Sequence, residues 1–332
     1  MNRAASAIRQ PEEQEAQHMR LWPRVRRVLT LVFFAGVATL LYSQARHIEW
    51  GEVLDVIAGF PASSIFEAGA LVALSYGIYS SYDLLGRAWT SHGLPAWKVM
   101  AVTFVSYAFN LNLGTLVGGF AFRFRLYSSF GLGNAVITRV LALSLTTNWL
   151  GYLAVAGCVF AFGVITPPPG WEIGATALHG VGFAMMGAAV AYLMLCGTSR
   201  RREWTLRGHE ISLPPLRLAA LQLLLSCANW SVIAAVIFVL MPGNVAYPSV
   251  LGVLLTGALA SAIAHIPAGL GVLEAVFIAL LVPPLSRGEV LAGLLAYRAL
   301  YYLAPLLIAC GAYLFLEAVA KKQSNRKPDA RD

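Results

Sequence analysis

Charged residues are scarce in this sequence, and it has no long polar stretch. Asp, Glu, Lys and Arg together make up 12% of its 332 residues, about half of their usual share in soluble domains. The polar stretches are all too short to form a separate domain of the usual ~50 residues or more. We therefore expect no soluble catalytic domain, which excludes most classes of enzyme.

The sequence also lacks the short motifs that carry common enzyme chemistry. It contains no Walker-type phosphate loop, no Gly-x-Ser-x-Gly elbow and no His-Glu-x-x-His pair. Its four cysteines have neither the spacing of a disulfide framework nor that of a metal site, and they lie in or beside apolar runs: Cys158, Cys196, Cys227 and Cys310. We interpret them as small packing residues. These absences predict a protein that is not an enzyme and that uses no metal or cofactor.

Long apolar runs occupy most of the chain, in which hydrophobic residues make up 58%. A run of about 18 apolar residues is long enough to cross a bilayer as a helix. Eight apolar segments can be recognised, at residues 28–45, 62–85, 99–121, 134–165, 175–197, 217–240, 249–283 and 290–317. The sequence therefore predicts an all-α polytopic membrane protein.

The first apolar run, at residues 28–45, has two interpretations. Basic residues precede it, and Ser43-Gln44-Ala45 resembles the cleavage site of a secretory signal peptide. The preceding tail is long for a signal peptide, so we expect a retained first span. A cleaved signal is the alternative.

The basic residues favour one way of crossing the membrane. The net charge is +8, without a lysine-rich patch interleaved with aromatic residues, so we expect no nucleic-acid partner. If all eight segments cross, Lys and Arg are divided between both sides. If 99–121 and 249–283 enter and leave on the same side, only Arg46 and Arg287 lie outside. The positive-inside rule favours this second model, in which the segment Arg123–Arg125 is cytoplasmic.

Both proposed re-entrant hairpins contain helix breakers. Segment 99–121 contains Asn110, Asn112 and Gly114, followed by Gly118 and Gly119, and segment 249–283 contains His265, Pro267, Gly269 and Gly271. Each arm would have about 10–16 residues and would reach roughly the middle of the bilayer. Two kinked full spans are the alternative, because glycine and proline are tolerated in such helices.

The order of spans and hairpins predicts an inverted repeat. Each half would contain two spans, a hairpin and a third span, giving about six full spans and two re-entrant hairpins. The halves would be residues 22–165 and 174–320 of a single membrane domain spanning 22–320. Residues 1–21 and the basic stretch 321–332 would be cytoplasmic tails. Inverted repeats with broken helices are typical of secondary transporters.

Ionisable residues inside spans are costly and mark candidate functional positions. They are Glu67, Arg139, His265, Glu274 and Arg298. Arg139 and Arg298 each follow a hairpin, and the guanidinium group suits bidentate binding of phosphate. A phospholipid headgroup is the phosphate available in a membrane.

Other roles for the same residues stay open. Glu274 and Arg298 are alternatively a structural ion pair, or Glu274 balances charge or shuttles a proton. His265 is either a proton relay or a partner for unwound backbone. Uncharged polar residues near the charges are predicted to line a cavity: Asn110, Asn112, Asn148, Tyr301 and Tyr302. Hydrogen bonding between helices explains these polar residues inside the spans nearly as well.

Several stretches resemble a known family of bacterial inner-membrane proteins. They are Tyr107–Asn112, Gly118-Gly119, Phe122–Tyr127, Thr138-Arg139, Thr146–Tyr152, His265–Leu280 and Ala296–Tyr302. The family is YbhN-like and is grouped with the membrane domain of lysylphosphatidylglycerol synthase, whose Pro-Gly/Ala-Gly-Leu-Gly-x-x-Glu motif is matched by Pro267, Gly269, Gly271 and Glu274. The resemblance implies a flippase-like membrane domain that handles phospholipid. The aminoacyltransferase domain of the synthase has no counterpart in this sequence.

The sequence thus predicts a bacterial inner-membrane protein that binds or translocates phospholipid. Both termini would lie in the cytoplasm. The alternative is a scaffold that does not transport and that recruits a phospholipid synthase or a second copy of itself.

Overall fold

The computed structural model describes residues 58–165, 174–200, 203–206, 209–242, 245–264 and 271–325, together with Thr39, Gly51, Asp55 and Gly269. The chain divides into two units, Met1–Trp50 and Gly51–Asp332. The predicted first span at 28–45 lies outside the described residues except for Thr39, as do the tails at 1–21 and 326–332. The fold below is that of the second unit.

The described part of this unit is helical apart from one short β-hairpin, in agreement with the predicted all-α class. The elements are α3 (Ala62–Ser80), α4 (Tyr82–Thr90), α5 (Ala96–Leu113), the π-helix η1 (Thr115–Ala121), α6 (Phe122–Ser129), α7 (Asn134–Ala161), α8 (Ala175–Thr198), β1 (Glu203–Leu206), β2 (His209–Ser212), α9 (Leu216–Val239), α10 (Tyr247–Ala264), α11 (Val272–Leu281), α12 (Arg287–Arg298), the π-helix η3 (Ala299–Leu303) and α13 (Ala304–Asn325). The antiparallel pair β1–β2, which the sequence did not predict, joins α8 to α9.

Four of the described helices are long and apolar enough to cross a membrane. They are α7, α8, α9 and the continuous run Arg287–Lys322 through α12, η3 and α13. Helices α10 and α11 are apolar but shorter. The predicted segment 62–85 is divided between α3 and α4, which meet at Ser81. The number of crossings and the inverted repeat stay predictions.

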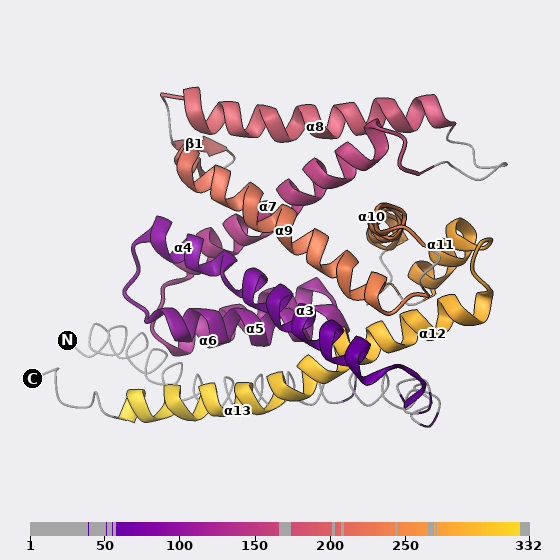
Figure 1. The fold of residues 1–332 in the computed structure, drawn as a ribbon. Coiled ribbons are helices and arrows are strands. Elements are labelled where there is room, and N and C mark those ends of the chain that lie inside the picture. Colours follow the sequence, from indigo (N-terminus) through magenta and orange to yellow (C-terminus); the bar gives the residue numbers. More distant parts are fainter. Residues whose placement is uncertain are drawn as a thin grey trace, which may run out of the picture. The chain divides into compact units, whose positions relative to one another are not determined.

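The chain reverses direction at hairpin one, and the two helices of hairpin two pack against each other. In hairpin one, α5 packs beside η1 and α6, and Gly114 at the turn has a φ of 83°, which favours glycine. Phe109 stacks on Phe122 with ring centroids 4.1 Å apart. In hairpin two, α10 packs beside α11 (Figure 1). Whether the hairpins are re-entrant stays a prediction.

The first arm of each hairpin is longer than predicted. Helices α5 and α10 have 18 residues each, about 27 Å, which is close to the ~30 Å hydrocarbon thickness of a bilayer. Helix α5 starts before the apolar run because Lys98, inside its first turn, is buried over the ring of Phe130 at 4.8 Å. A cation on an aromatic face is a favourable contact that hydropathy does not register.

Helices from distant parts of the chain pack together in this unit. Helix α3 packs against α9, α7 against both α8 and α9, α5 against α13, and α10 against α7 and α9 (Figure 1). Small residues allow close crossings: a Cβ at Gly182 of α8 would lie 2.3 Å from the backbone nitrogen of Ala161 in α7. Such crossings are typical of helices packed in membranes.

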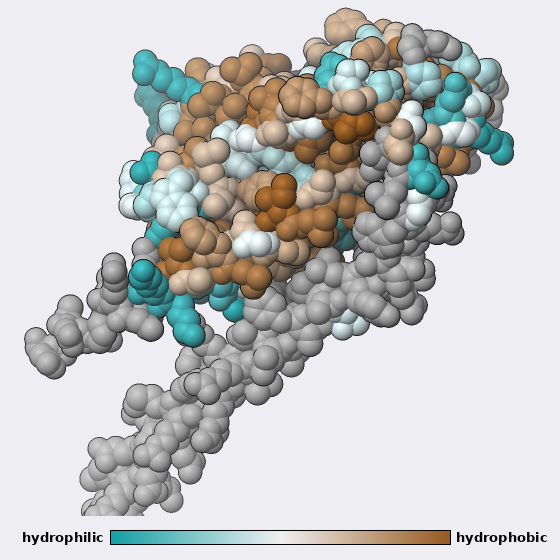
Figure 2. Space-filling model, turned by 60° about the horizontal axis from the view of Figure 1, so that its bottom comes forward, coloured by the Kyte–Doolittle hydropathy of each residue, from teal (hydrophilic) through white to brown (hydrophobic). Residues whose placement is uncertain are grey.

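The surface carries many large apolar side chains. Helix α8 is apolar all round, yet its buried residues are limited to Gly182, Ala189 and Cys196. Phe66 and Leu116 are 80% and 81% exposed. Figure 2 shows apolar side chains over much of one face, with hydrophilic groups mainly at its edges. Exposed apolar area on this scale is expected of a surface in contact with lipid.

Candidate functional site

Residues of both hairpins line one cavity of about 580 Å³. Hairpin one contributes Asn110, Gly114 and Thr115 at its turn, and hairpin two contributes Ser261, Gly269 and Leu273. Residues of α7, α9, α12 and η3 complete the wall: Asn148, Trp149, Tyr152, Trp230, Ile233, Tyr297, Tyr301 and Tyr302. The volume is in the usual range for small-molecule sites.

The wall of the cavity is mostly apolar, and its polar groups carry no charge. Its polar groups are the amides of Asn110 and Asn148 and the hydroxyls of serine, threonine and tyrosine side chains. The Oδ1 atom of Asn110 is buried and has no hydrogen-bond partner among the described residues. An unsatisfied buried acceptor is costly, so a ligand that donates a hydrogen bond would be stabilised beside it.

Helix α7 places Asn148 at the cavity but not Arg139. Asn148 accepts hydrogen bonds at its backbone oxygen from Ser226 (3.1 Å) and Trp230 (3.2 Å), both on α9. The two helices approach closely, because a Cβ at Gly151 would lie 2.1 Å from Ser226 Oγ. Arg139 precedes Asn148 by nine residues, about 14 Å along a helix, and it does not line the cavity.

The π-helix η3 holds two adjacent tyrosines that were predicted to line a cavity, and they contact different partners. Tyr301 is buried, and its hydroxyl lies 2.7 Å from Ser75 Oγ and 3.0 Å from the Tyr107 hydroxyl. Tyr302 instead presents its ring to the Arg298 guanidinium at 5.6 Å. A π-turn is wider than an α-turn, so the spacing expected for an α-helix does not apply here. Both tyrosines line the cavity.

Asn112 connects hairpin one to η3 and does not line the cavity. Its side-chain amide donates to the backbone oxygen of Ala108 at 2.8 Å and to that of Tyr302 at 3.3 Å. The amide is therefore engaged within the protein.

Arg298 and Glu274 form an ion pair behind the cavity wall. Arg298 Nε donates to Glu274 Oε1 at 2.6 Å, and Arg298 Nη2 lies 3.4 Å from the backbone oxygen of Gly269. The other carboxylate oxygen of Glu274 accepts the backbone N–H of Gly271 at 2.9 Å. Gly269 and Gly271 have φ values of 58° and 78°, a conformation that favours glycine. The ion-pair interpretation is confirmed, and the pair ties α12 to the turn of hairpin two.

The residues in the centre of that turn lie outside the described part of the chain. They include His265 and Pro267, so both roles considered for His265 stay predictions. Gly118 and Gly119 lie in η1 and are buried.

A second buried ion pair was missed by the sequence analysis. Asp83 on α4 is fully buried, and its Oδ2 atom lies 3.3 Å from Arg123 Nε on α6. The Tyr127 hydroxyl donates to the same oxygen at 2.7 Å. The Arg123 side chain is 6% exposed, so it is packed inside the protein; that its segment is cytoplasmic stays a prediction. Asp83 lies within the predicted apolar segment 62–85. A charged residue inside such a segment is the signal that could have revealed this pair.

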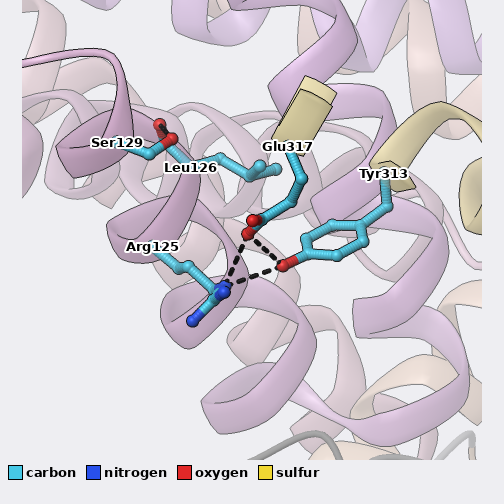
Figure 3. Close-up of polar contacts among 5 residues, drawn as sticks. All are labelled: Arg125, Leu126, Ser129, Tyr313 and Glu317. Carbon is cyan, nitrogen blue, oxygen red and sulfur yellow. Dashed lines mark hydrogen bonds and ion pairs between the residues drawn. The ribbon is translucent and has the colours of Figure 1, made fainter. Parts of the chain in front are cut away.

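Arg125 on the same short helix is also paired. Its Nε atom donates to Glu317 Oε1 at 2.8 Å and to the Tyr313 hydroxyl at 2.7 Å. The Tyr313 hydroxyl donates to the same carboxylate. Figure 3 shows the three side chains converging from α6 and α13. This cluster fastens hairpin one to the last helix, with both charges partly exposed.

The described residues contain no group of three or more His, Cys, Asp or Glu side chains that could hold a metal ion. The fold and the cavity together define a multi-helix membrane protein with an uncharged cavity that two helical hairpins line, in which a few polar groups lie among apolar side chains.

Comparison with known proteins identifies the family. No family model matches the chain. Over 302 residues it is 45% identical to the inner membrane protein YbhN of Escherichia coli (strain K12), a match that covers 91% of the chain and 95% of YbhN. The chain therefore belongs to the YbhN family of inner membrane proteins.

Two further relatives are more distant. Over 309 residues the chain is 29% identical to the uncharacterized protein slr0712 of a Synechocystis species, covering 90% of the chain and 96% of that protein. Over 307 residues it is 24% identical to a phosphatidylglycerol lysyltransferase of Staphylococcus haemolyticus. That match covers 87% of the chain but 34% of the lysyltransferase. The resemblance expected from the sequence is confirmed.

Proposed function

We propose that this protein binds the polar headgroup of a phospholipid in the cavity between the hairpins and moves the lipid across the inner membrane. The observation that carries the proposal is the cavity itself, which residues of both hairpins line. Broken helices that converge on a site within a membrane domain are typical of transporters. In this proposal the lipid is moved and is not chemically changed.

The chemistry of the wall supports a headgroup as the ligand. Amide and hydroxyl groups of Asn110, Asn148 and Tyr302 offer donors and acceptors to phosphate and glycerol oxygens. Trp149 and Leu116 also line the cavity and are 42% and 81% exposed, so apolar surface continues outward from these polar groups. One distant relative is by name a phosphatidylglycerol lysyltransferase, which supports a phospholipid as substrate class.

Arg298 would bind the phosphate only after a rearrangement. Its guanidinium is held by Glu274 and by the Gly269 carbonyl, although it lies beside Tyr302 in the wall. A phosphate offers two oxygens to the planar fork of arginine, so a bound headgroup would compete with Glu274. That competition would loosen the turn of hairpin two. The cavity-facing role predicted for Arg139 has no support from the lining residues.

The inverted repeat is part of the same proposal. Each hairpin packs against the last helix of the other proposed half: α5 of hairpin one against α13, and α10 of hairpin two against α7. An inverted repeat would produce this reciprocal packing, with the cavity at the centre. Alternating access would follow from movement of one half against the other.

A cavity-blocking variant tests the proposal. Ala258 of α10 lines the cavity, so Ala258→Trp should fill it. Ala279 of α11 is exposed, so Ala279→Trp serves as the matched control. In liposomes that contain fluorescent phosphatidylglycerol, wild type and Ala279→Trp should expose labelled lipid to an external quencher faster than empty liposomes do. Ala258→Trp should lose this activity.

A second measurement identifies the lipid. Native mass spectrometry of the purified protein should show a retained phospholipid, and Ala258→Trp should retain less of it. If all three proteins give the quenching rate of empty liposomes and retain no lipid, the proposal is wrong. The scaffold interpretation would then be favoured.

A further inference from the structure

We infer that the first turn of α5, together with the ammonium group of Lys98, binds a phosphate group at the membrane surface. Helix α5 begins at Ala96, and Lys98 is its third residue. Neither Lys98 nor its neighbour Trp97 lines the cavity. The site is therefore separate from the proposed lipid path, and it does not rest on the proposed function.

The Lys98 ammonium is buried without a negative charge beside it. The residue is 5% exposed, and its Nζ atom lies 4.8 Å from the ring centroid of Phe130 and 5.6 Å from that of Trp97. It has neither an ion pair nor a hydrogen-bond acceptor among the described residues. A ring face attracts a cation but does not accept its three N–H donors as oxygen atoms would. A lysine that is almost fully buried normally has a charged partner.

The start of α5 adds free donors and more positive charge. Its N-cap is Pro95, which provides no side-chain hydrogen bond, and its first turn contains no acidic residue. The backbone N–H groups of Ala96 and Trp97 have no backbone acceptor among the described residues, as is usual at the start of a helix. That end of a helix carries about half a positive charge, which repels a cation in the first turn. An anion bound there would be attracted by both the helix and Lys98.

The loop before α5 brings a second basic residue to the same end. Arg87 on α4 donates from its Nε atom to the backbone oxygen of Leu94 at 2.7 Å, two residues before α5 begins. The acidic residue of α4, Asp83, is already paired with Arg123 and accepts the Tyr127 hydroxyl. The charge at the start of α5 is therefore positive.

A phosphate group fits these donors, and a lipid headgroup is its favoured source. Phosphate oxygens accept strong hydrogen bonds from lysine and from the N–H groups of a helix start. Trp97 and Met100 are 50% and 36% exposed, so apolar surface lies beside the site, and tryptophan is typical of the membrane–water interface. Under the predicted orientation this end of α5 faces the cytoplasm, where anionic lipids attract basic residues. A free phosphate ion is the other source of the same chemistry.

Counting bound lipids by native mass spectrometry tests the site in the purified full-length protein. Phosphatidylglycerol is added to delipidated protein in detergent. Lys98→Met keeps an apolar side chain of similar length and removes the charge, so it should bind one lipid fewer than wild type, with an affinity at that site about tenfold lower. Lys321→Met, at an exposed position of α13, is the matched control and should bind as wild type does.

Two further variants separate the charge from the backbone donors. Lys98→Arg keeps the positive charge and should retain the lipid. Ala96→Pro removes one N–H at the first position of the helix, where proline is well tolerated, so the protein should fold and bind the lipid more weakly. If Lys98→Met does not fold, Ala96→Pro gives the same comparison with wild type.

Inorganic phosphate distinguishes the two sources. The thermal midpoint is compared in phosphate and in chloride at equal ionic strength, with and without phosphatidylglycerol. The measurement uses Ala258→Trp, in which the cavity is filled. A rise with the lipid alone identifies a headgroup, a rise with inorganic phosphate alone identifies the free ion, and a rise with each means that they share the site. In every case adding Lys98→Met should abolish the rise.

Two results would overturn the proposal. One is the absence of any rise with either probe, and the other is a rise and a lipid count that Lys98→Met leaves unchanged, because Lys98 would then be held by the aromatic rings alone. Loss of lipid in Ala258→Trp but not in Lys98→Met would count against this site and leave the proposed function standing. The opposite result would support this site and count against the cavity.

Discussion

Replacing Gly118 with alanine would measure how tightly hairpin one is closed. A Cβ at Gly118 would lie 2.0 Å from the backbone nitrogen of Asn110 and 2.2 Å from the carbonyl carbon of Phe109. Real Cβ atoms essentially never come within 3.0 Å of another heavy atom, so η1 and α5 must separate by roughly 1 Å in this close-packed interior. The obstacle is backbone, which cannot rotate away as a side chain can.

The expected loss of stability is large for a single methyl group. Overpacking typically costs about 1–3 kcal/mol, and we expect the upper end because the stacked pair Phe109–Phe122 must separate as well. By the scaling for large domains, a loss of 3 kcal/mol lowers the thermal midpoint by roughly 6–12 °C. The measurement is thermal unfolding of the purified protein in detergent.

Two other glycines serve as controls for Gly118→Ala. Gly77 lies inside α3 with nothing within 4 Å of its Cβ position, so Gly77→Ala should stabilise the protein by up to ~1 kcal/mol through helix propensity. A Cβ at Gly119 meets the Asn110 side chain at 3.2 Å, so Gly119→Ala should have an intermediate effect. If Gly118→Ala unfolds at the temperature of wild type, the arms of hairpin one are not packed as described.

Three more expectations concern the Glu274–Arg298 ion pair, His92 in the loop after α4, and the two ends of α8. Arg298→Ala should lower the free energy of unfolding by about 1–3 kcal/mol because it leaves the partly exposed Glu274 carboxylate without its ionic partner, and adding Glu274→Gln should restore part of that loss in a double-mutant cycle. Burial lowers the pKa of His92 from its ordinary value of 6.5. Below about pH 6.5 the unfolded chain therefore binds more protons than the folded protein, and the free energy of unfolding should fall as the pH drops. If His92→Gln shows the same dependence of stability on pH as wild type, this reasoning is wrong. In a variant without the native cysteines, a cysteine placed at Arg200 should react with an impermeant reagent only in broken cells. A cysteine placed at Gly174, at the other end of α8, should react in intact cells. The reverse pattern would invert the predicted orientation of α8.

The hairpins could be predicted from the sequence because their signal is local. Glycine and asparagine at the turn of hairpin one interrupt an apolar run, and backbone at membrane depth must find partners. The start of the first arm of hairpin one could not be predicted, since Lys98 is buried on Phe130 and hydropathy counts it as a charge. The break between α3 and α4 at Ser81 likewise has no proline or glycine to mark it.

The site was predicted in part for the same reason. Asn110, Asn148, Tyr301 and Tyr302 line the cavity as the sequence indicated, because polar residues inside apolar segments are visible one at a time. The pairing of Asp83 with Arg123 depends on which helices meet in three dimensions, and a count of basic residues assigns Arg123 to a loop. The π-helix η3 alters the phase between Arg298 and the tyrosines, which fixed α-helical spacing cannot register.

The cluster of Figure 3 has a consequence for biogenesis. Arg125 is synthesised 192 residues before Glu317 and 188 residues before Tyr313, whereas Asp83 is already present when Arg123 is made. Hairpin one can thus associate with α4 while the ribosome is still translating the second half. Its attachment to α13 must wait until that helix has been synthesised. The cluster can therefore form only after the whole membrane domain has been synthesised. In nascent chains halted before Tyr313, hairpin one should be held less firmly against the other helices than in the finished protein.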